Sequence, residues 1–152
     1  YYAEPAWDRK LPAATRFLAL TNWNKEAVLD KETGLVWERS PTADLFSWGS
    51  AVFACAGRTT GNRKGWRLPS VHELASLIDP AAQVFPNPNL PLGHPFQGVQ
   101  YDFYWSATTI AGFTTGAWVV HLGNNGLVDG FDKSVMTSLV WCVRGGMNAG
   151  VH

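Results

Sequence analysis

Cys55 and Cys142 are the two cysteines of this 152-residue chain, and they are the side chains best suited to covalent chemistry. Cys55 shares the i, i+3, i+4, i+7 spacing of Trp48, Ala51 and Val52, which places its thiol on the apolar stripe of a short helix. Cys142 lies in a β-branched and aromatic run that is typical of a buried strand. One buried sulfur toward each end of the chain suggests a disulfide, and the alternative is two separate thiols that pack as small hydrophobic groups.

A disulfide between these positions would close a long loop and contribute about 4–5 kcal/mol in the chain-entropy model. It would also require an oxidising compartment, so we expect an extracytoplasmic protein that is periplasmic, secreted or at the cell surface. The chain starts at Tyr1 without a methionine, and we expect a processed or trimmed form.

The remaining reactive side chains do not form the pattern of an enzyme. The histidines are His72, His94, His121 and His152. None of them lies at i, i+4 from another histidine or from a cysteine, so the spacing of a zinc site is absent. His121 alternates with Trp118 and Val120 on a predicted strand and is interpreted as a wall residue. Ser106, Ser134 and Ser138 lack a glycine elbow, and no glycine-rich phosphate loop occurs. We therefore expect no catalytic activity, no metal and no cofactor.

A calcium site would need several oxygen ligands held by one loop. The segment Asn87-Pro88-Asn89 contains no carboxylate and precedes the predicted core sheet. Asp129 and Asp132, with Gly130 between them, could hold a hard cation, and the alternative, which we favour, is that they are solvated turn residues.

The composition fits one compact domain with a sizeable core. The chain is 46% hydrophobic and 16% charged, with eight tryptophans and eight phenylalanines, which excludes disorder and favours a loop-rich fold. The formal net charge is zero, whereas nucleic-acid binding normally needs a basic field, so no nucleic-acid partner is expected. No apolar run approaches the roughly 18 residues of a membrane-spanning helix, and no membrane span is expected.

Hydrophobic periodicity predicts strands, then two helices, a long loop and an antiparallel sheet, which is the α+β class. The predicted strands cover residues 17–20, 27–30, 35–38, 104–109, 117–122, 127–128 and 139–144, the last of which closes the sheet. The second helix starts at a capping box of Ser70 and Glu73 and ends before Pro80. Arg67 is interpreted as the partner of a buried carboxylate or of a backbone carbonyl. We expect residues 1–16 to form an irregular arm, residues 17–147 the domain and residues 148–152 a tail.

Four separated blocks of the chain resemble the Lcl C-terminal-domain family and occur in the family's order. They include Ala27-Val28-Leu29-Asp30, Gly65-Trp66-Arg67-Leu68-Pro69-Ser70, Tyr104-Trp105-Ser106-Ala107-Thr108-Thr109 and Trp141-Cys142-Val143-Arg144-Gly145-Gly146. The similarity extends from about Arg16 to Gly146. It implies a C-type-lectin-like fold, of the branch that includes the formylglycine-generating enzyme, with two helices on a small twisted antiparallel sheet. In that fold a disulfide joins the first helix to the last strand, at the positions of Cys55 and Cys142.

The resemblance also implies where a ligand would bind, because the loops and strands before the last strand form the recognition surface of C-type-lectin-like proteins. This surface combines rigid aromatic groups with small polar ones, a composition that suits glycan or protein recognition. The predicted ligand-binding residues are Phe113, Thr114, Trp118, His121, Asn124, Asp129, Phe131 and Lys133, surrounded by Thr108, Asn125, Met136, Thr137 and Ser138. Phe113 and Phe131 lie in glycine-flanked loops, where they either contact a ligand or merely cap the sheet.

Arg58, Arg63 and Lys64 form a candidate anion patch, in the stretch between Asp44 and Glu73 that holds no acidic residue. The family's adhesin member binds glycosaminoglycans, and such a cluster would attract a sulfated polysaccharide. The alternative is a solvated loop.

Together these features predict a non-catalytic extracellular recognition or adhesion module that binds a glycan or a protein through the C-terminal sheet face. The alternative is a structural subunit of a cell-surface or extracellular assembly, either a filament or an oligomer. In that case Tyr1, Tyr2 and Trp7 of the arm would pack into a neighbouring copy. Relatives of the formylglycine-generating type are oxidases that use late cysteines, and here Cys142 would be committed to the bridge.

Overall fold

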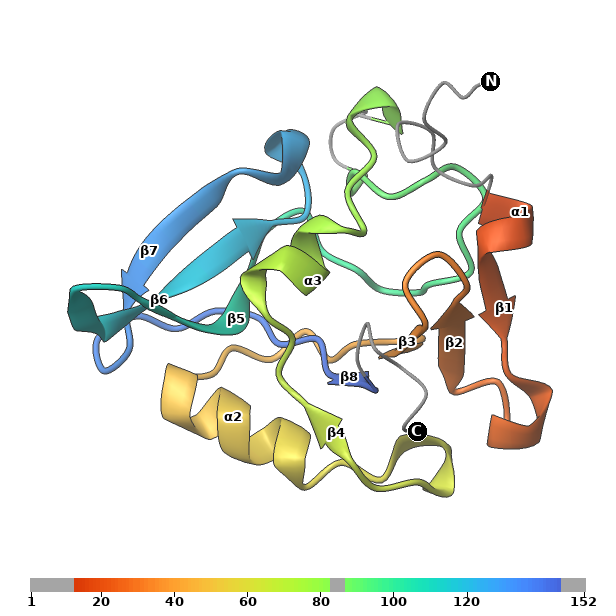
Figure 1. Cartoon of the computed structure of the whole chain (residues 1–152), viewed down its shortest axis with the longest axis horizontal. Helices are drawn as coiled ribbons and strands as arrows, with labels where there is room; N and C mark the ends of the chain where they lie inside the picture. Colours follow the sequence, from red (N-terminus) through yellow and green to blue (C-terminus); the bar gives the residue numbers. More distant parts are fainter. Residues whose placement is uncertain (1–12, 83–86, 146–152) are drawn as a thin grey trace.

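The computed structural model describes residues 13–82 and 87–145, and these form an α+β domain with two antiparallel sheets (Figure 1). Five strands make the larger sheet, in the order β1-β2-β3-β8-β4, and three make the smaller one, in the order β5-β6-β7. The strands are β1 (Phe17–Ala19), β2 (Ala27–Asp30), β3 (Leu35–Glu38), β4 (Trp66–Arg67), β5 (Phe103–Ile110), β6 (Phe113–His121), β7 (Val128–Asp132) and β8 (Val143–Arg144). The helices are α1 (Ala13–Arg16), α2 (Trp48–Ala56) and α3 (Val71–Ala75), and the short 3-10 turns are η2 (Thr21–Trp23), η3 (Thr60–Asn62), η4 (Pro80–Ala82) and η5 (Asn124–Gly126). The predicted α+β class is confirmed.

Residues 1–12 of the predicted arm lie outside the described residues, and the last four residues of that arm form helix α1 instead of an irregular segment. Arg16 at the end of α1 is fully buried. Its guanidinium donates two 2.8 Å hydrogen bonds to the carboxylate of Asp30 and another to the carbonyl of Ser76. A buried charge needs such partners. Arg16 therefore fixes α1 to β2 and to the end of α3.

The predicted strand at residues 139–144 is wrong over most of its length. A strand, β8, forms at Val143 and Arg144, and it pairs with β3 and β4 in the five-stranded sheet. Upstream, Leu139 makes an isolated bridge to Tyr104 of β5. Residues 140–142, between Leu139 and β8, cross from one sheet to the other, and their side chains are buried. The β-branched and aromatic composition of this segment therefore indicates that it is buried. It does not show that the whole segment pairs with a neighbouring strand.

The disulfide between Cys55 and Cys142 is formed, with 5.4 Å between the two Cα atoms. It joins α2 to the crossing segment just before β8, and both cysteines are fully buried. Ala51 lies on the same buried stripe of α2, whereas Val52 is 37% exposed. The helix and its buried thiol are thus as predicted, but the buried stripe is narrower than the apolar spacing indicates.

Two apolar clusters fill the space between the sheets and the helices. One surrounds Trp37, Trp141 and Phe96, and the ring of Trp141 lies 5.2 Å from that of Trp37 and 4.9 Å from that of Phe96. The other surrounds the disulfide. Strand β6 contributes Val120 to the first cluster and Val119 to the second. Successive side chains of a strand point to opposite faces, so the three-stranded sheet is packed on both faces over part of its length.

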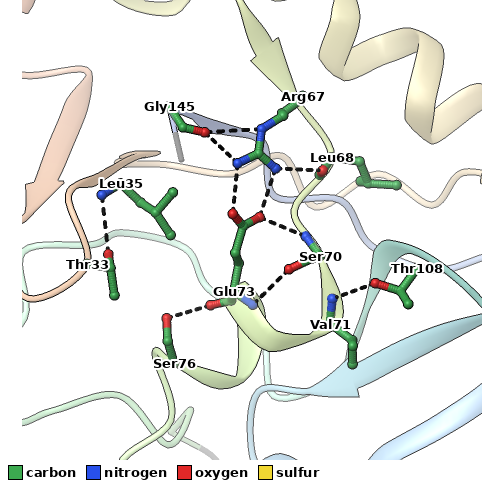
Figure 2. A network of polar contacts seen from close by, with 10 residues as sticks. All are labelled: Thr33, Leu35, Arg67, Leu68, Ser70, Val71, Glu73, Ser76, Thr108 and Gly145. Carbon is green, nitrogen blue, oxygen red and sulfur yellow. Dashed lines mark hydrogen bonds and ion pairs between the residues drawn. The ribbon is translucent and has the colours of Figure 1, made fainter. Parts of the chain in front are cut away.

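Helix α3 begins at the predicted capping box (Figure 2). The hydroxyl of Ser70 accepts the amide hydrogen of Glu73, and the carboxylate of Glu73 accepts that of Ser70. These two bonds satisfy amide groups that the first turn of a helix leaves without partners. The helix ends at Ala75, earlier than predicted, although Leu77 and Ile78 beyond it are still buried.

Arg67 connects α3 to the rest of the domain (Figure 2). Its guanidinium donates two 2.8 Å hydrogen bonds to the carboxylate of Glu73 and also binds the carbonyl of Gly145. At the start of α3, the amide of Val71 donates a 3.0 Å hydrogen bond to the hydroxyl of Thr108 in β5. The structural interpretation of Arg67 is confirmed. These bonds set the position of α3 against the three-stranded sheet.

Candidate functional site

The residues predicted to bind a ligand are divided between the two faces of the three-stranded sheet. Val119 of β6 faces the cluster that contains α2 residues, and Val120 faces the cluster that contains α3 residues. We call these faces the α2 side and the α3 side. Directly paired residues of neighbouring strands share a face, and Asp129 pairs with Val119. Among the predicted residues, His121, Asp129 and Phe131 lie on the α2 side. Trp118 lies on the α3 side, where the ring of Phe113 also lies beside Gly116.

Four half-buried rings form a continuous row on the α2 side, which we call the aromatic strip: Tyr101, Phe103, His121 and Phe131. The ring centroids lie 4.9 Å apart for Tyr101 and His121, 4.7 Å for His121 and Phe103, and 5.1 Å for Phe103 and Phe131. The buried ring of Trp105 continues the row 5.9 Å beyond Phe131. Such separations are favourable for aromatic pairs. The strip therefore joins ring surface from all three strands.

Contacts with the backbone fix the Tyr101 end of the strip. The Nδ1 atom of His121 accepts a 3.0 Å hydrogen bond from the amide of Gly123, so this nitrogen acts as the unprotonated one. The ring of Tyr101 lies directly against Gly123, where a Cβ atom would come within 2.1 Å of Cε2 of the tyrosine. A larger residue at this position would displace the ring. The orientation of both rings is thus set by the fold.

The two polar residues beside the strip, Asp129 and Lys133, differ in how many contacts they make within the domain. Asp129 is exposed, and its carboxylate accepts a 2.8 Å hydrogen bond from the amide of Gly130. The Nζ atom of Lys133 lies 4.2 Å from the ring centre of Trp48 and donates a 3.0 Å hydrogen bond to the hydroxyl of Thr109. A cation over an aromatic face is attracted to it. Lys133 therefore holds α2 against the sheet, whereas Asp129 offers its carboxylate to solvent.

The other predicted residues lie apart from this row. Phe113 is 58% exposed at the start of β6, whereas Phe131 is half-buried against the cluster around the disulfide. Both residues lie in strands and not in the glycine-flanked loops predicted for them. Each keeps part of its ring accessible. Thr114 is exposed near the start of β6, and Asn124 is exposed in η5 beyond its end.

On the α3 side, Trp118 lines an apolar groove of about 250 Å³ between α3 and β7. The remaining lining residues are Val71, His72, Ala75 and Val128. Trp118 and the strip thus face away from each other across one sheet. A single ligand on one face cannot reach both.

Two members of the candidate anion patch are engaged in contacts within the domain. The Nε atom of Arg58 lies 3.0 Å from the carboxylate of Glu38. Arg63 donates to a backbone carbonyl, and its guanidinium covers the ring of Trp23 at 4.2 Å. The side chain of Lys64 is exposed. The patch therefore offers less free positive charge than its sequence indicates.

A polar hollow of about 420 Å³ lies at the end of β3 and is lined by Lys25, Glu26, Glu38, Arg39, Ser40, Thr60 and Gln97. The buried carboxylate of Glu38 accepts hydrogen bonds from the hydroxyl of Thr60 at 2.8 Å and from the amide of Cys142 at 3.2 Å, besides its ion pair with Arg58. A buried carboxylate with this many partners is a structural group. It joins η3 to the segment that carries the disulfide.

Within residues 13–82 and 87–145, no group of three or more His, Cys, Asp or Glu side chains is arranged to hold a metal ion. Asp132, one of the acidic residues of β7, accepts 2.8 Å hydrogen bonds from the amide and the hydroxyl of Ser134. In the same part of the chain, none of the helices is long and apolar enough to cross a membrane.

Sequence reasoning missed Tyr101 and Phe103. Phe103 directly precedes the predicted strand and alternates with Trp105, a pattern that places both on one face. That signal was available in the sequence. Tyr101 lies before β5, and its place in the strip depends on its contact with Gly123, for which no local pattern exists.

The fold and the site together define a class of protein, a disulfide-bridged α+β domain whose smaller sheet carries an aromatic surface. The chain belongs to the Lcl C-terminal domain family, whose family model matches residues 26–144. This match includes both cysteines and the whole of the three-stranded sheet. A comparison with curated proteins gives no match.

Proposed function

We propose that this protein is a non-catalytic recognition or adhesion module that acts outside the cytoplasm and binds a glycan or a protein through the aromatic strip. The proposal includes a C-type-lectin-like fold, of the branch that contains the formylglycine-generating enzyme. The observation that carries it is the unbroken row of four half-buried rings across three strands.

Half-buried rings suit recognition because they combine exposed apolar surface with a fixed orientation. Neighbouring rings and backbone hold each one, so little conformational freedom is lost when a ligand binds. Their exposed surface is suited to packing against the C–H face of a sugar or against an apolar side chain. The carboxylate of Asp129 on the same face would accept a hydrogen bond from a ligand hydroxyl or amide and so orient it.

Two further observations support a binding role without catalysis. His94 and His121 accept hydrogen bonds from backbone amides, whereas a catalytic base would accept one from a hydroxyl or thiol nucleophile. Cys142 is used by the disulfide and is not available for oxidase chemistry. The same disulfide supports an extracytoplasmic location, because such bonds persist in oxidising compartments.

A second candidate function, a structural subunit of a surface assembly, is supported by a different observation. Several large apolar side chains are strongly exposed: Leu45 by 61%, Phe53 by 82%, Leu92 by 81% and Val135 by 75%. Contacts between subunits would bury such groups. The N-terminal arm would add to these contacts.

The test of the binding role is a glycan and protein array probed with the wild type and with two matched variants, Phe131→Leu and Phe113→Leu. Both variants replace a phenylalanine by an apolar residue, which preserves folding better than truncation to alanine. Phe131 belongs to the strip, whereas the ring of Phe113 lies beside Gly116, which is on the α3 side. We expect Phe131→Leu to weaken each hit about tenfold and Phe113→Leu to leave it within about twofold.

Thermal unfolding of both variants provides the folding control. Hits that depend on Phe113 and are indifferent to Phe131 would assign binding to the other face. An array without hits would contradict the recognition role itself.

A further inference from the structure

Strand β7 is the outer strand of the three-stranded sheet, with β6 between it and β5 (Figure 1). The amide of His121 donates to the carbonyl of Leu127, and that of Lys133 to the carbonyl of Thr115, each at 2.8 Å. In an antiparallel pair, alternate residues bond to the neighbouring strand, so these two bonds fix the pattern for the whole ladder. The residues of β7 whose backbone groups point away from β6 are Val128, Gly130 and Asp132.

Some of these outward groups already have local partners. The carboxylate of Asp129 accepts the amide hydrogen of Gly130, and the carbonyl of Asp132 accepts that of Met136. Among the described residues, the amide and the carbonyl of Val128 and the carbonyl of Gly130 have none. Free backbone groups in a row along a strand are a template for the pairing of another chain.

The apolar groove lies beside this edge. Val128 is 43% exposed and forms one wall of the groove, while Trp118 and the residues of α3 form the rest. Gly130 carries no side chain, and a Cβ atom there would come within 2.8 Å of Cδ1 of Ile110. The face next to the edge is therefore apolar, and the side chain of Ile110 fills the space over Gly130.

We propose that the outer edge of β7 binds an extended segment of another protein by strand addition, with an aliphatic side chain in the apolar groove and a basic side chain beside Asp129. A residue added opposite Val128 or Gly130 points to the α3 side, where the groove lies. Its neighbours in the added strand point to the α2 side, where Asp129 lies. Aliphatic and basic residues would thus alternate in the partner.

The charge of β7 decides which partner fits. The strand carries two acidic residues, Asp129 and Asp132, and no basic one. Lys133, which follows it, is held by Trp48 and Thr109. Pairing of two copies through this edge would bring four carboxylates to one seam, and like charges on paired strands are destabilising. A basic segment of a different protein is the complementary occupant.

This site lies at the outer edge of β7 and in the apolar groove on the α3 side. It shares Asp129 with the surface beside the aromatic strip but uses none of the four rings, so it goes beyond the function proposed for the strip. The probe is a fluorescein-labelled peptide of sequence TKLKLKT, with TELELET as its acidic counterpart, and binding is measured by fluorescence anisotropy. We expect the basic peptide to bind at least tenfold more tightly than the acidic one.

Two N-methylated forms of the basic peptide test the backbone pairing without altering the protein. One carries the methyl groups on the leucine amides and the other on the lysine amides. In strand addition, alternate amides of the peptide face β7, so one form should lose at least tenfold in affinity and the other should bind as the parent peptide does. Equal affinities of the two forms would overturn the proposal.

Two protein variants test the groove. Ala75→Phe fills it, and Ala56→Phe places the same side chain on an exposed position of α2. Ala75→Phe should lower the affinity for the basic peptide at least tenfold, and Ala56→Phe should leave this affinity unchanged. Equal affinities of these variants would overturn the proposal. Phe103→Leu changes the strip on β5, the strand of this sheet farthest from the outer edge of β7. It should leave peptide binding unchanged, so a failure of this site and a failure of the aromatic strip are distinguishable.

Discussion

Removal of the disulfide is expected to cost a large share of the free energy of unfolding. Cys55 and Cys142 are 87 positions apart in the sequence. In the chain-entropy model, a cross-link that closes a loop of this length restricts the unfolded chain by about 4–5 kcal/mol. Replacement of each buried sulfur by hydrogen adds roughly 1 kcal/mol of lost packing. Since the free energy of unfolding of a domain is about 5–15 kcal/mol in total, the variant without the disulfide should be close to unfolding at room temperature.

The assay is urea unfolding, followed by tryptophan fluorescence, of the wild type, Cys55→Ala, Cys142→Ala and the double variant. A single substitution already removes the cross-link, so each single variant should lose nearly as much stability as the double variant. A loss of stability below about 1 kcal/mol in the double variant would contradict this role of the disulfide, and so would two single losses that add up to the double one.

Two further predictions concern an ion pair and the assembly state. Burial opposes ionisation of Glu73, but the hydrogen bonds from Arg67 and Ser70 and the charge of Arg67 hold its pKa below the usual value. A depressed pKa in the folded state contributes stability above the unfolded value of 4.5, and that stability is lost as the pH falls through the folded pKa. The melting temperature of the wild type should therefore fall more steeply below about pH 4.5 than that of Glu73→Gln, and parallel curves would rule out this role of the carboxylate. For the assembly state, light scattering of the wild type and of a chain without residues 1–12 should give the mass of one copy in both cases, because the recognition role needs no partner copy. An oligomer that dissociates when the arm is removed would favour the structural subunit.

The elements that follow from local chemistry were predictable from the sequence. Ser70 and Glu73 specify the start of α3 through their own side chains. The spacing around Cys55 gives the helix and its buried thiol, and the family resemblance gives its partner. The start of α3 and the helix around Cys55 are each determined by side chains a few residues apart in the sequence. The pairing of Cys55 with Cys142 is implied by the family resemblance.

The division of the candidate site between two faces was not predictable in the same way. Alternation along β6 separates Trp118 from His121, but which face α2 or α3 covers depends on tertiary packing. The ladder between β5 and β6 also contains register shifts between Trp105 and Ile110, which local patterns do not reveal. Similarly, the crossing segment before β8 has the composition of a strand because it is buried, although it pairs with neither sheet over most of its length.

Recognition on the α2 side of the three-stranded sheet, at the aromatic strip, is tested most directly by NMR chemical-shift mapping of the labelled wild-type protein with the best ligand from the array. We expect the largest shift changes at the rings of Tyr101, Phe103, His121 and Phe131, while the Trp118 indole on the opposite face stays unchanged. Large changes at Trp118 with the strip unchanged would contradict recognition at the strip.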